Sequence, residues 1–103
     1  SCDLIFIDGD HRYAAISEDI RLWQSKVRPG GIFCGDDCEG RPTEFDHQEL
    51  QGNKNNDAVH IARAGSNVMT ANVHCGVILA VSEAFGDDCE ILGAPPSIWS
   101  RDM

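Results

Sequence analysis

The sequence has few basic residues and no long apolar run. Lys and Arg number 8 against 17 Asp and Glu, so the formal net charge is −9. Phosphate contacts need Lys and Arg, and this balance therefore argues against nucleic acid or an anionic membrane as a partner. No stretch approaches the roughly 18 apolar residues that a membrane-spanning helix needs. We expect no nucleic-acid partner and no membrane partner.

The cysteines also lack any recognisable pattern. There are five, an odd number, and they stand at Cys2, Cys34, Cys38, Cys75 and Cys89. No C-x-x-C motif occurs, and the spacings match no zinc site. The first ten residues contain neither the basic region nor the cleavage site of a signal peptide. We interpret the cysteines as reduced thiols of a cytoplasmic protein.

What is present is typical of a globular chain. Apolar residues make up 42% and charged residues 24% of 103 residues, which suits one domain spanning 1–103. The clearest pattern lies in residues 3–40. Leu4–Ile7 and Gly31–Gly35 are apolar runs of the kind found in buried parallel strands. A helix is predicted between them, from Tyr13 to Lys26, and a helical crossover makes the two strands parallel.

The predicted helix has an apolar face and a defined end. Ile16, Ile20, Trp23 and Val27 recur at helical spacing and are expected to be buried. Pro29-Gly30-Gly31 is expected to stop the helix and reverse the chain. Trp23 is therefore predicted to lie in the core, as is Trp99 near the end of the chain.

Acidic residues follow both predicted strands. Asp8 and Asp10 come after the first, and Asp36 and Asp37 come after the second. Parallel neighbours place their carboxyl ends on one rim of the sheet, where open α/β sheets bind ligands. We expect Asp8, Asp36 and Asp37 to converge there, and oxygen ligands alone suit Mg²⁺ or Ca²⁺ rather than zinc. The alternative is that these acids only cap strand ends and turns.

Asp10 and His11 lie at the first acidic corner. His11 is a candidate general base or metal ligand, and Asp10 is a candidate catalytic partner. Two plainer readings stay open: Asp10 as the N-cap of the following helix, and His11 as a solvated loop residue. His47, His60 and His74 are interpreted as surface histidines.

The second half of the chain is less regular. Residues 41–72 are polar and are expected to form a long loop, with a short helix at Asp57–Ala64 that begins at an Asp57 N-cap. A further helix is predicted at His74–Phe85. Cys89–Leu92 and Ser97–Arg101 are expected to pair as antiparallel strands around a Gly93–Pro96 turn. Gly-Asp-Asp-Cys-Glu occurs twice, at Gly35–Glu39 and Gly86–Glu90, which we interpret as coincidence because the flanking residues do not repeat.

A family resemblance follows from these motifs. The sequence D-L-I-F-I-D-G-D-H-R-Y, the amphipathic helix after it, R-P-G-G-I-F-C-G-D-D and the later G-V-I-L-A-V-S-E-A-F resemble the second half of class I S-adenosylmethionine-dependent methyltransferases. The nearest group is the small O-methyltransferases. The resemblance covers residues 3–37 well and residues 74–85 moderately. It implies an α/β fold, a partial Rossmann-like sheet built from the equivalents of strands four, five, seven and six.

The resemblance also implies roles for the acidic corners. In metal-dependent members, an acid after strand four and two residues after strand five hold Mg²⁺, which orients the hydroxyl of a small-molecule acceptor. The matching positions are Asp8, Asp36 and Asp37. The lysine base of the catechol-type members has no match here, and Asp10 and His11 stand in its place.

Other parts of the family pattern do not occur in these residues. The first three strands, the glycine-rich loop and the ribose-binding acid have no match, so we expect S-adenosylmethionine to bind only in a complete enzyme. The strand at Asp3–Ile7 would then be an unpaired apolar edge, which favours a homo-oligomer joined through that edge.

Two other functions fit parts of the sequence. One is a non-catalytic α/β scaffold that self-associates through the bare edge. The other is a haloacid-dehalogenase-type phosphatase, because Asp8 and Asp10 form a D-x-D motif after a strand. Against the phosphatase, Arg12 stands where that family has Thr, and only about 25 residues separate the two acidic motifs.

Overall fold

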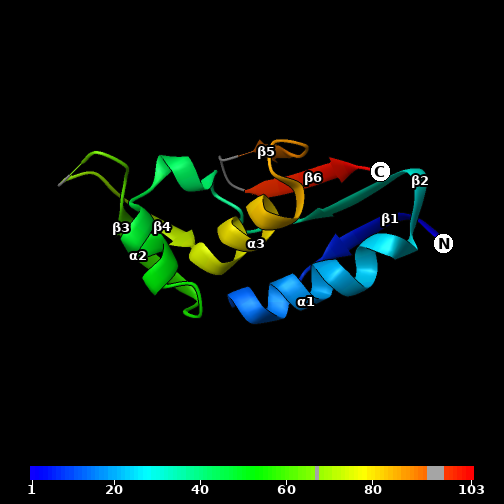
Figure 1. Ribbon diagram of the computed structural model, residues 1–103, viewed down its shortest axis with the longest axis horizontal. Helices are drawn as coiled ribbons and strands as arrows, with labels where there is room; N and C mark the ends of the chain where they lie inside the picture. The colour runs from blue at the N-terminus through cyan, green and yellow to red at the C-terminus, as the bar shows by residue number, and fades with distance from the viewer. Residues whose placement is uncertain (67, 93–96) are drawn as a thin grey trace.

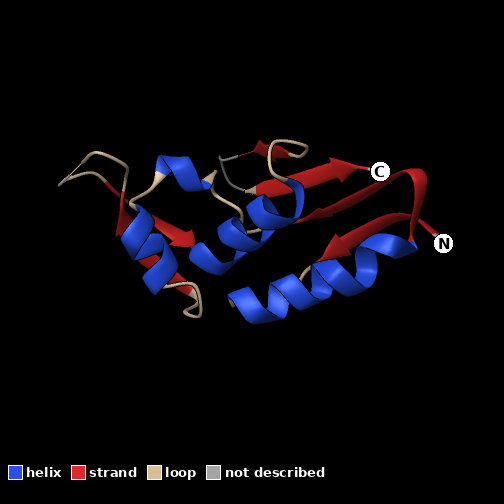
Figure 2. Ribbon diagram, in the orientation of Figure 1, coloured by secondary structure: helices blue, strands red, loops and turns tan. Residues whose placement is uncertain are grey.

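The computed structural model describes residues 1–66, 68–92 and 97–103, and it contains two sheets with the helices packed beside them (Figure 1). The elements follow in the order β1 (Cys2–Ile7), α1 (Tyr13–Trp23), η1 (Gln24–Lys26), β2 (Val27–Gly35), η2 (Pro42–Glu44), α2 (His47–Gly52), β3 (Ala58–Ala62), β4 (Thr70–His74), α3 (Cys75–Phe85), β5 (Glu90–Leu92) and β6 (Ile98–Asp102). The molecule is elongated, with the small β3–β4 hairpin at one end and the four-stranded sheet toward the other (Figure 2).

The main sheet has the strand order β1-β2-β6-β5. β1 and β2 are parallel, whereas β6 runs antiparallel to both of its neighbours. The predicted parallel pair in residues 3–40 and the predicted antiparallel pair at the end of the chain are therefore confirmed. The predicted turn at residues 93–96 lies outside the described residues. This mixed sheet with its helices is consistent with a partial Rossmann-like methyltransferase fold.

The core lies between this sheet and two helices. α1 and α3 pack against each other, and Ile16 and Ile20 of α1 join the same buried cluster as Val77 and Ile78 of α3. Trp99 of β6 is fully buried, as predicted, and contacts the Phe33 ring at a centroid distance of 5.3 Å. Burial of these aromatic and aliphatic side chains supplies most of the favourable free energy of folding.

Gly35 allows β2 and β6 to lie close together at the end of β2. It is paired with Trp99 across the sheet. A Cβ at this position would lie 2.6 Å from Trp99 Nε1 and 2.9 Å from the Ile7 carbonyl oxygen. Only glycine fits there, and the acidic pair Asp36 and Asp37 follows directly.

The helix prediction was wrong at its end. α1 finishes at Trp23 and continues as the 3₁₀ turn η1, and Trp23 is 43% exposed rather than buried. Val27 is buried, but it belongs to β2. The Pro29-Gly30-Gly31 segment lies within β2 as an irregularity, since Cys2 pairs with Val27 while Leu4 pairs with Ile32.

Residues 41–72, predicted as a long loop, contain η2, α2, β3 and β4. The predicted helix at Asp57–Ala64 was wrong, because Ala58–Ala62 is a strand paired antiparallel with Thr70–His74. The physical reason is that burial alternates from one residue to the next, as it does in a strand. Ile61 and Val73 are buried, and their neighbours along each strand are more exposed. α2 begins instead at an Asp46 N-cap, whose side chain accepts a hydrogen bond from the Glu49 amide at 3.0 Å.

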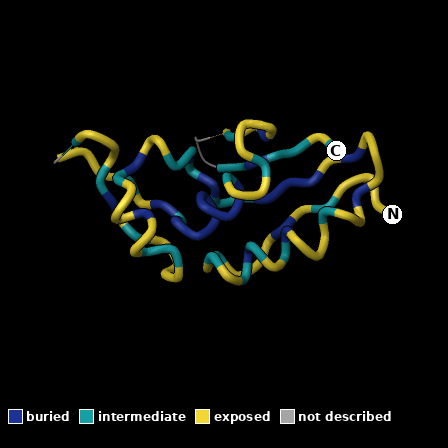
Figure 3. Tube along the Cα trace, viewed as in Figure 1, coloured by how far each residue is buried: buried dark blue, intermediate teal, exposed yellow. Residues whose placement is uncertain are grey.

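One face of the main sheet carries exposed apolar side chains. Leu4 and Phe6 of β1 are 59% and 46% exposed, and Ile32, the cross-strand partner of Leu4, is 39% exposed. β1 is also the edge strand, and the Cα trace is largely exposed along it (Figure 3). Parallel strands are normally covered on both faces. Among the described residues, no helix is long and apolar enough to cross a membrane.

Candidate functional site

The rim where β1 and β2 end holds three of the predicted site residues. His11, Asp36 and Asp37 each offer a ligand atom, and these atoms lie within 4.8 Å of one another. His11 Nε2 is 2.7 Å from Asp37 Oδ2. The parallel pairing of β1 and β2 produces this arrangement, because it brings the loop after β1 beside the residues after β2.

Asp37 has a backbone conformation that non-glycine residues rarely adopt. Its φ is 60°, in the left-handed region. A single residue there costs on the order of 1 kcal/mol, although Asp and Asn tolerate the region better than most. The next residue, Cys38, is fully buried, and its amide donates to the Ser97 carbonyl at 3.0 Å. Burial of Cys38 therefore holds the bend that places the Asp37 carboxylate beside His11.

Asp8 lies near this cluster but is exposed to solvent. None of the groups of potential ligands found in the described residues includes it. The Asp8 charge still affects Asp36. Burial, the Asp37 charge and the Asp8 charge, in decreasing order, raise the pKa of the Asp36 carboxyl above its ordinary value. Of the predicted trio, Asp36 and Asp37 therefore lie together on the rim beside His11, whereas Asp8 lies at the margin of the cluster.

Asp10 interacts with Arg12 and not with His11. Its Oδ1 accepts a hydrogen bond from the Arg12 amide at 2.9 Å, and its Oδ2 is 3.4 Å from the Arg12 guanidinium. Arg12 is the N-cap residue of α1. The Asp10 side chain therefore stabilises the turn that enters α1, which is close to the capping alternative.

Three further residues complete the cluster, and the sequence analysis assigned none of them to the site. His11 Nδ1 is 2.7 Å from Asp57 Oδ1, and the His11 and His74 ring centroids are 4.4 Å apart. His74 Nδ1 is 2.6 Å from Glu39 Oε2. The His74 side chain is only 16% exposed, so its interpretation as a surface histidine was wrong.

A sequence signal for these residues did exist. Polar and apolar residues alternate in Thr70–His74, the larger apolar residues Val59 and Ile61 are two positions apart in Ala58–Ala62, and Gly65 lies between the segments, which is typical of a β-hairpin. A hairpin in that register pairs Ala58 with His74. It therefore predicts that Asp57 and His74 lie at the same end of the hairpin.

Both ring nitrogens of His11 face carboxylates. Burial lowers the pKa of His11, but the hydrogen bond with Asp57 and the charges of Asp37, Asp57 and Asp36 outweigh it, and the pKa lies above its ordinary value of 6.5. The same hydrogen bond lowers the pKa of the Asp57 carboxyl. Without a bound cation, this site favours the imidazolium form of His11.

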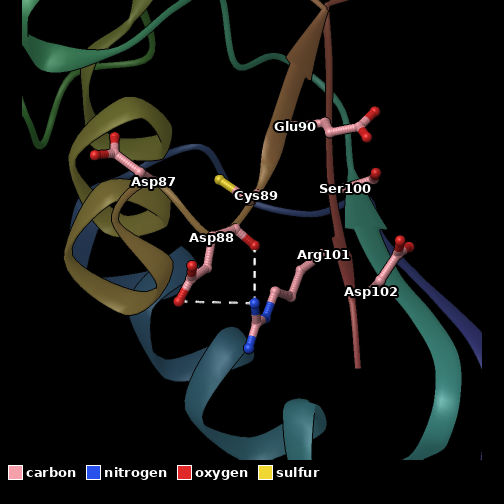
Figure 4. A pocket seen from close by; sticks show the side chains of 7 residues that line it. All are labelled: Asp87, Asp88, Cys89, Glu90, Ser100, Arg101 and Asp102. Carbon is pink, nitrogen blue, oxygen red and sulfur yellow. Dashed lines mark hydrogen bonds and ion pairs between the residues drawn. The ribbon is translucent and has the colours of Figure 1, made fainter.

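The second Gly-Asp-Asp-Cys-Glu segment has a different environment. Asp87 and Asp88 follow α3, and the Arg101 Nη1 atom lies 2.9 Å from the Asp88 carbonyl oxygen and 3.9 Å from Asp88 Oδ2 (Figure 4). Arg41 Nη1 is 3.7 Å from Asp87 Oδ1. In the described part of the chain, no Lys or Arg forms a comparable ion pair with Asp36 or Asp37. Of the two acidic pairs, only Asp36 and Asp37 are therefore available to a metal cation.

The donor atoms on the rim fit a divalent cation. Two carboxylates and one imidazole can approach a common ion, and the carboxylates have no Lys or Arg partner among the described residues. Mg²⁺ prefers oxygen ligands alone, whereas an imidazole nitrogen suits Mn²⁺, Fe²⁺ or Zn²⁺. The chemistry of the set therefore favours a transition metal over Mg²⁺ if His11 is a ligand.

Residues 1–38 match the family model of a methyltransferase domain. This match supports a methyltransferase domain. No curated protein shows significant similarity to the chain, and neither does any solved structure. The matched segment contains β1, α1, β2 and the rim residues Asp36 and Asp37, but it ends before Glu39, Asp57 and His74.

Proposed function

We propose that the chain forms the acceptor side of an S-adenosylmethionine-dependent O-methyltransferase. The observation that carries the proposal is the cluster of His11, Asp36 and Asp37, which lies on the sheet rim within a segment that matches a methyltransferase domain. The strand order β1-β2-β6-β5 supports it, since this is the order that strands four, five, seven and six would have in the family that the sequence resembles. No described residue is assigned to S-adenosylmethionine, which we propose is bound only in a complete enzyme.

The rim residues have distinct roles in this proposal. Asp36 and Asp37, with His11 or with Asp8, would hold a divalent cation, Mg²⁺ or Mn²⁺, that orients and acidifies the hydroxyl of a small-molecule acceptor. S-adenosylmethionine, when bound, would supply a methyl group on sulfur, and the rim residues would present the acceptor oxygen to it. His11 would accept the hydroxyl proton when it is not a ligand. Asp57 fixes the ring by its contact with Nδ1.

Replacing the rim carboxylates should abolish cation binding. We expect Asp36→Asn with Asp37→Asn to weaken Mn²⁺ and Mg²⁺ binding by at least about tenfold, because charged ligands dominate affinity for hard cations. The melting temperature without metal should rise slightly, since repulsion between the two carboxylates is removed. Isothermal titration calorimetry and thermal unfolding measure the two effects.

The second copy of the motif supplies a matched control. Asp87→Asn with Asp88→Asn makes the same change in an identical pentapeptide whose acids lie beside Arg41 and Arg101. This variant should leave cation binding unchanged. The proposed site is contradicted if the starting protein binds neither Mn²⁺ nor Mg²⁺, or if both double variants lose binding equally.

A second candidate function is self-association without catalysis. It is favoured by the exposed apolar side chains of Leu4, Phe6 and Ile32 and by the position of β1 at the sheet edge. A hollow of about 350 Å³ beside this strand is lined by apolar residues such as Phe6 and Trp23 and by the acidic residues Asp8 and Asp19. A second copy of the chain could pair with β1 about a two-fold axis, which would join two sheets and satisfy the edge backbone groups.

Charges placed on the edge should prevent this association. We expect the wild-type chain to be a dimer in light scattering coupled to size-exclusion chromatography, and Leu4→Lys with Phe6→Lys to be a monomer. Leu22→Lys is the control, because Leu22 is similarly exposed, at 46%, but lies on α1. A wild-type chain that is still monomeric at about 100 μM would rule out this function, because a dimer with a dissociation constant of that order or lower would be detected.

A further inference from the structure

We propose that His11, Asp57 and His74 form a transition-metal site of the zinc type, which shares His11 with the rim cluster but uses neither Asp36 nor Asp37 as a ligand. This site would connect the β3–β4 hairpin to the loop after β1. Asp57 and His74 lie outside the segment that matches the methyltransferase domain, so the site goes beyond the proposed function.

The potential ligand atoms already lie close to one another. Asp57 Oδ1 lies 2.7 Å from His11 Nδ1 and 4.0 Å from His74 Nε2, and all three ligand atoms are within 4.8 Å of one another. Ligands placed 2.0–2.1 Å from zinc in a tetrahedron are about 3.3 Å apart. One observed separation is shorter than this value and the other is longer. A small shift of the exposed Asp57 side chain toward His74 would bring both near it.

The outer nitrogens of both imidazoles are held by other carboxylates. His11 Nε2 is 2.7 Å from Asp37 Oδ2, and His74 Nδ1 is 2.6 Å from Glu39 Oε2. Metal-bound histidines characteristically donate their second N–H to a carboxylate, which fixes the tautomer and the ring orientation. Each ring therefore has one nitrogen anchored and the other directed at Asp57.

The backbone around the two histidines restrains them. Glu39 also accepts a hydrogen bond from the His74 amide at 2.8 Å, so one carboxylate holds both the main chain and the ring of this residue. The His11 and His74 side chains are 26% and 16% exposed, whereas Asp57 is 75% exposed. The site thus has two restrained nitrogen ligands and one accessible carboxylate, which leaves an entry path and a fourth position for water.

The donor set selects the class of metal. Two imidazole nitrogens and one carboxylate oxygen suit Zn²⁺, and also Co²⁺ or Fe²⁺, better than Mg²⁺ or Ca²⁺. The rim pair Asp36 and Asp37 offers mainly oxygen. Because His11 Nδ1 faces Asp57 while Nε2 faces Asp37, binding at Nδ1 leaves the contact with Asp37 in place.

Zn²⁺ binding to the chelator-treated chain at neutral pH tests the site. We expect one tight site in calorimetry, and a loss of at least tenfold in affinity in both His74→Asn and Asp57→Asn. His60→Asn is the matched control: His60 lies on β3 but is exposed and belongs to no ligand group in the described residues, so its affinity should be unchanged. Co²⁺ absorption spectra provide a second readout, because the visible bands of a four-coordinate nitrogen-containing site should be lost in His74→Asn.

Comparing Zn²⁺ binding in the Asp36→Asn and His74→Asn variants distinguishes this site from the rim carboxylates. Asp36→Asn should leave Zn²⁺ binding intact, since Asp36 shares no group of potential ligands with His74 or Asp57 in the described residues. Loss of Zn²⁺ binding in Asp36→Asn but not in His74→Asn would place the metal on the rim and overturn the inference, while leaving the proposed function standing. No Zn²⁺ binding at all would also overturn it. Asp57→Asn keeps the test decisive if His74→Asn fails to fold, because an exposed side chain is altered.

Discussion

The Trp99→Ala variant is expected to lose about 3–5 kcal/mol of the free energy of unfolding. Trp99 is fully buried, and its ring lies against Phe33 and Phe85 at centroid distances of 5.3 Å and 5.8 Å. The cavity would open at the centre of the sheet, opposite Gly35, which has no side chain to fill it. Domains of this size have about 5–15 kcal/mol of stability, so the melting temperature should fall by more than about 10 °C.

Two comparison variants make this prediction specific. Trp23→Ala removes the same side chain from an exposed site, where the closest cation is Lys26 at 5.9 Å from the ring, and it should cost less than about 1 kcal/mol. Trp99→Phe should cost less than Trp99→Ala, since the buried Trp99 Nε1 has no hydrogen-bond partner among the described residues. Urea unfolding followed by far-ultraviolet circular dichroism measures all three. Equal losses in Trp23→Ala and Trp99→Ala would mean that the core is placed wrongly.

The first forty residues were predictable because their signals are local. A continuous apolar run, a helical period and a second apolar run give a parallel pair, and parallel pairing alone brings the ends of β1 and β2 together. That reasoning predicted that Asp8, Asp36 and Asp37 converge at the corner that carries His11, and Asp36 and Asp37 do lie beside His11, without Asp8. It failed for Trp23 because the helical period continues into η1, where the chain leaves the helix and turns the ring toward solvent.

The other side of the site was not predictable in the same way. Glu39 and His74 are 35 residues apart in the sequence and meet only after the β3–β4 hairpin forms. The prediction of a helix at residues 57–64 made Asp57 the N-cap of that helix. It therefore did not place Asp57 beside His11. Each strand of the hairpin is only five residues long, and only Thr70–His74 alternates clearly in polarity. So short a pattern is easily outweighed by the polar character of the surrounding residues.

Gly76→Ala is expected to damage both stability and the cluster of histidines. A Cβ at Gly76 would lie 2.5 Å from the Lys54 carbonyl oxygen, 2.5 Å from the Tyr13 amide nitrogen and 2.6 Å from the His11 carbonyl oxygen. All three atoms belong to the backbone, and the Tyr13 amide donates to the Lys54 carbonyl at 2.8 Å. The first turn of α3 therefore contacts two other segments where their backbones are hydrogen-bonded. Overpacking of this kind costs about 1–3 kcal/mol, and we expect the upper end because no single side chain can move aside.

Gly52→Ala separates this steric effect from the general effect of removing a glycine. Gly52 ends α2, and a Cβ there would meet no atom within 4 Å. Its replacement should leave stability unchanged or raise it by up to about 1 kcal/mol. Gly76→Ala should in addition weaken Zn²⁺ binding at temperatures where the variant is still folded, because displacing α3 moves His74 away from His11 and Asp57. A folded Gly76→Ala variant with wild-type stability would show that these three segments do not meet at Gly76. A destabilised variant with undiminished Zn²⁺ affinity would show instead that they meet there but do not position the metal ligands.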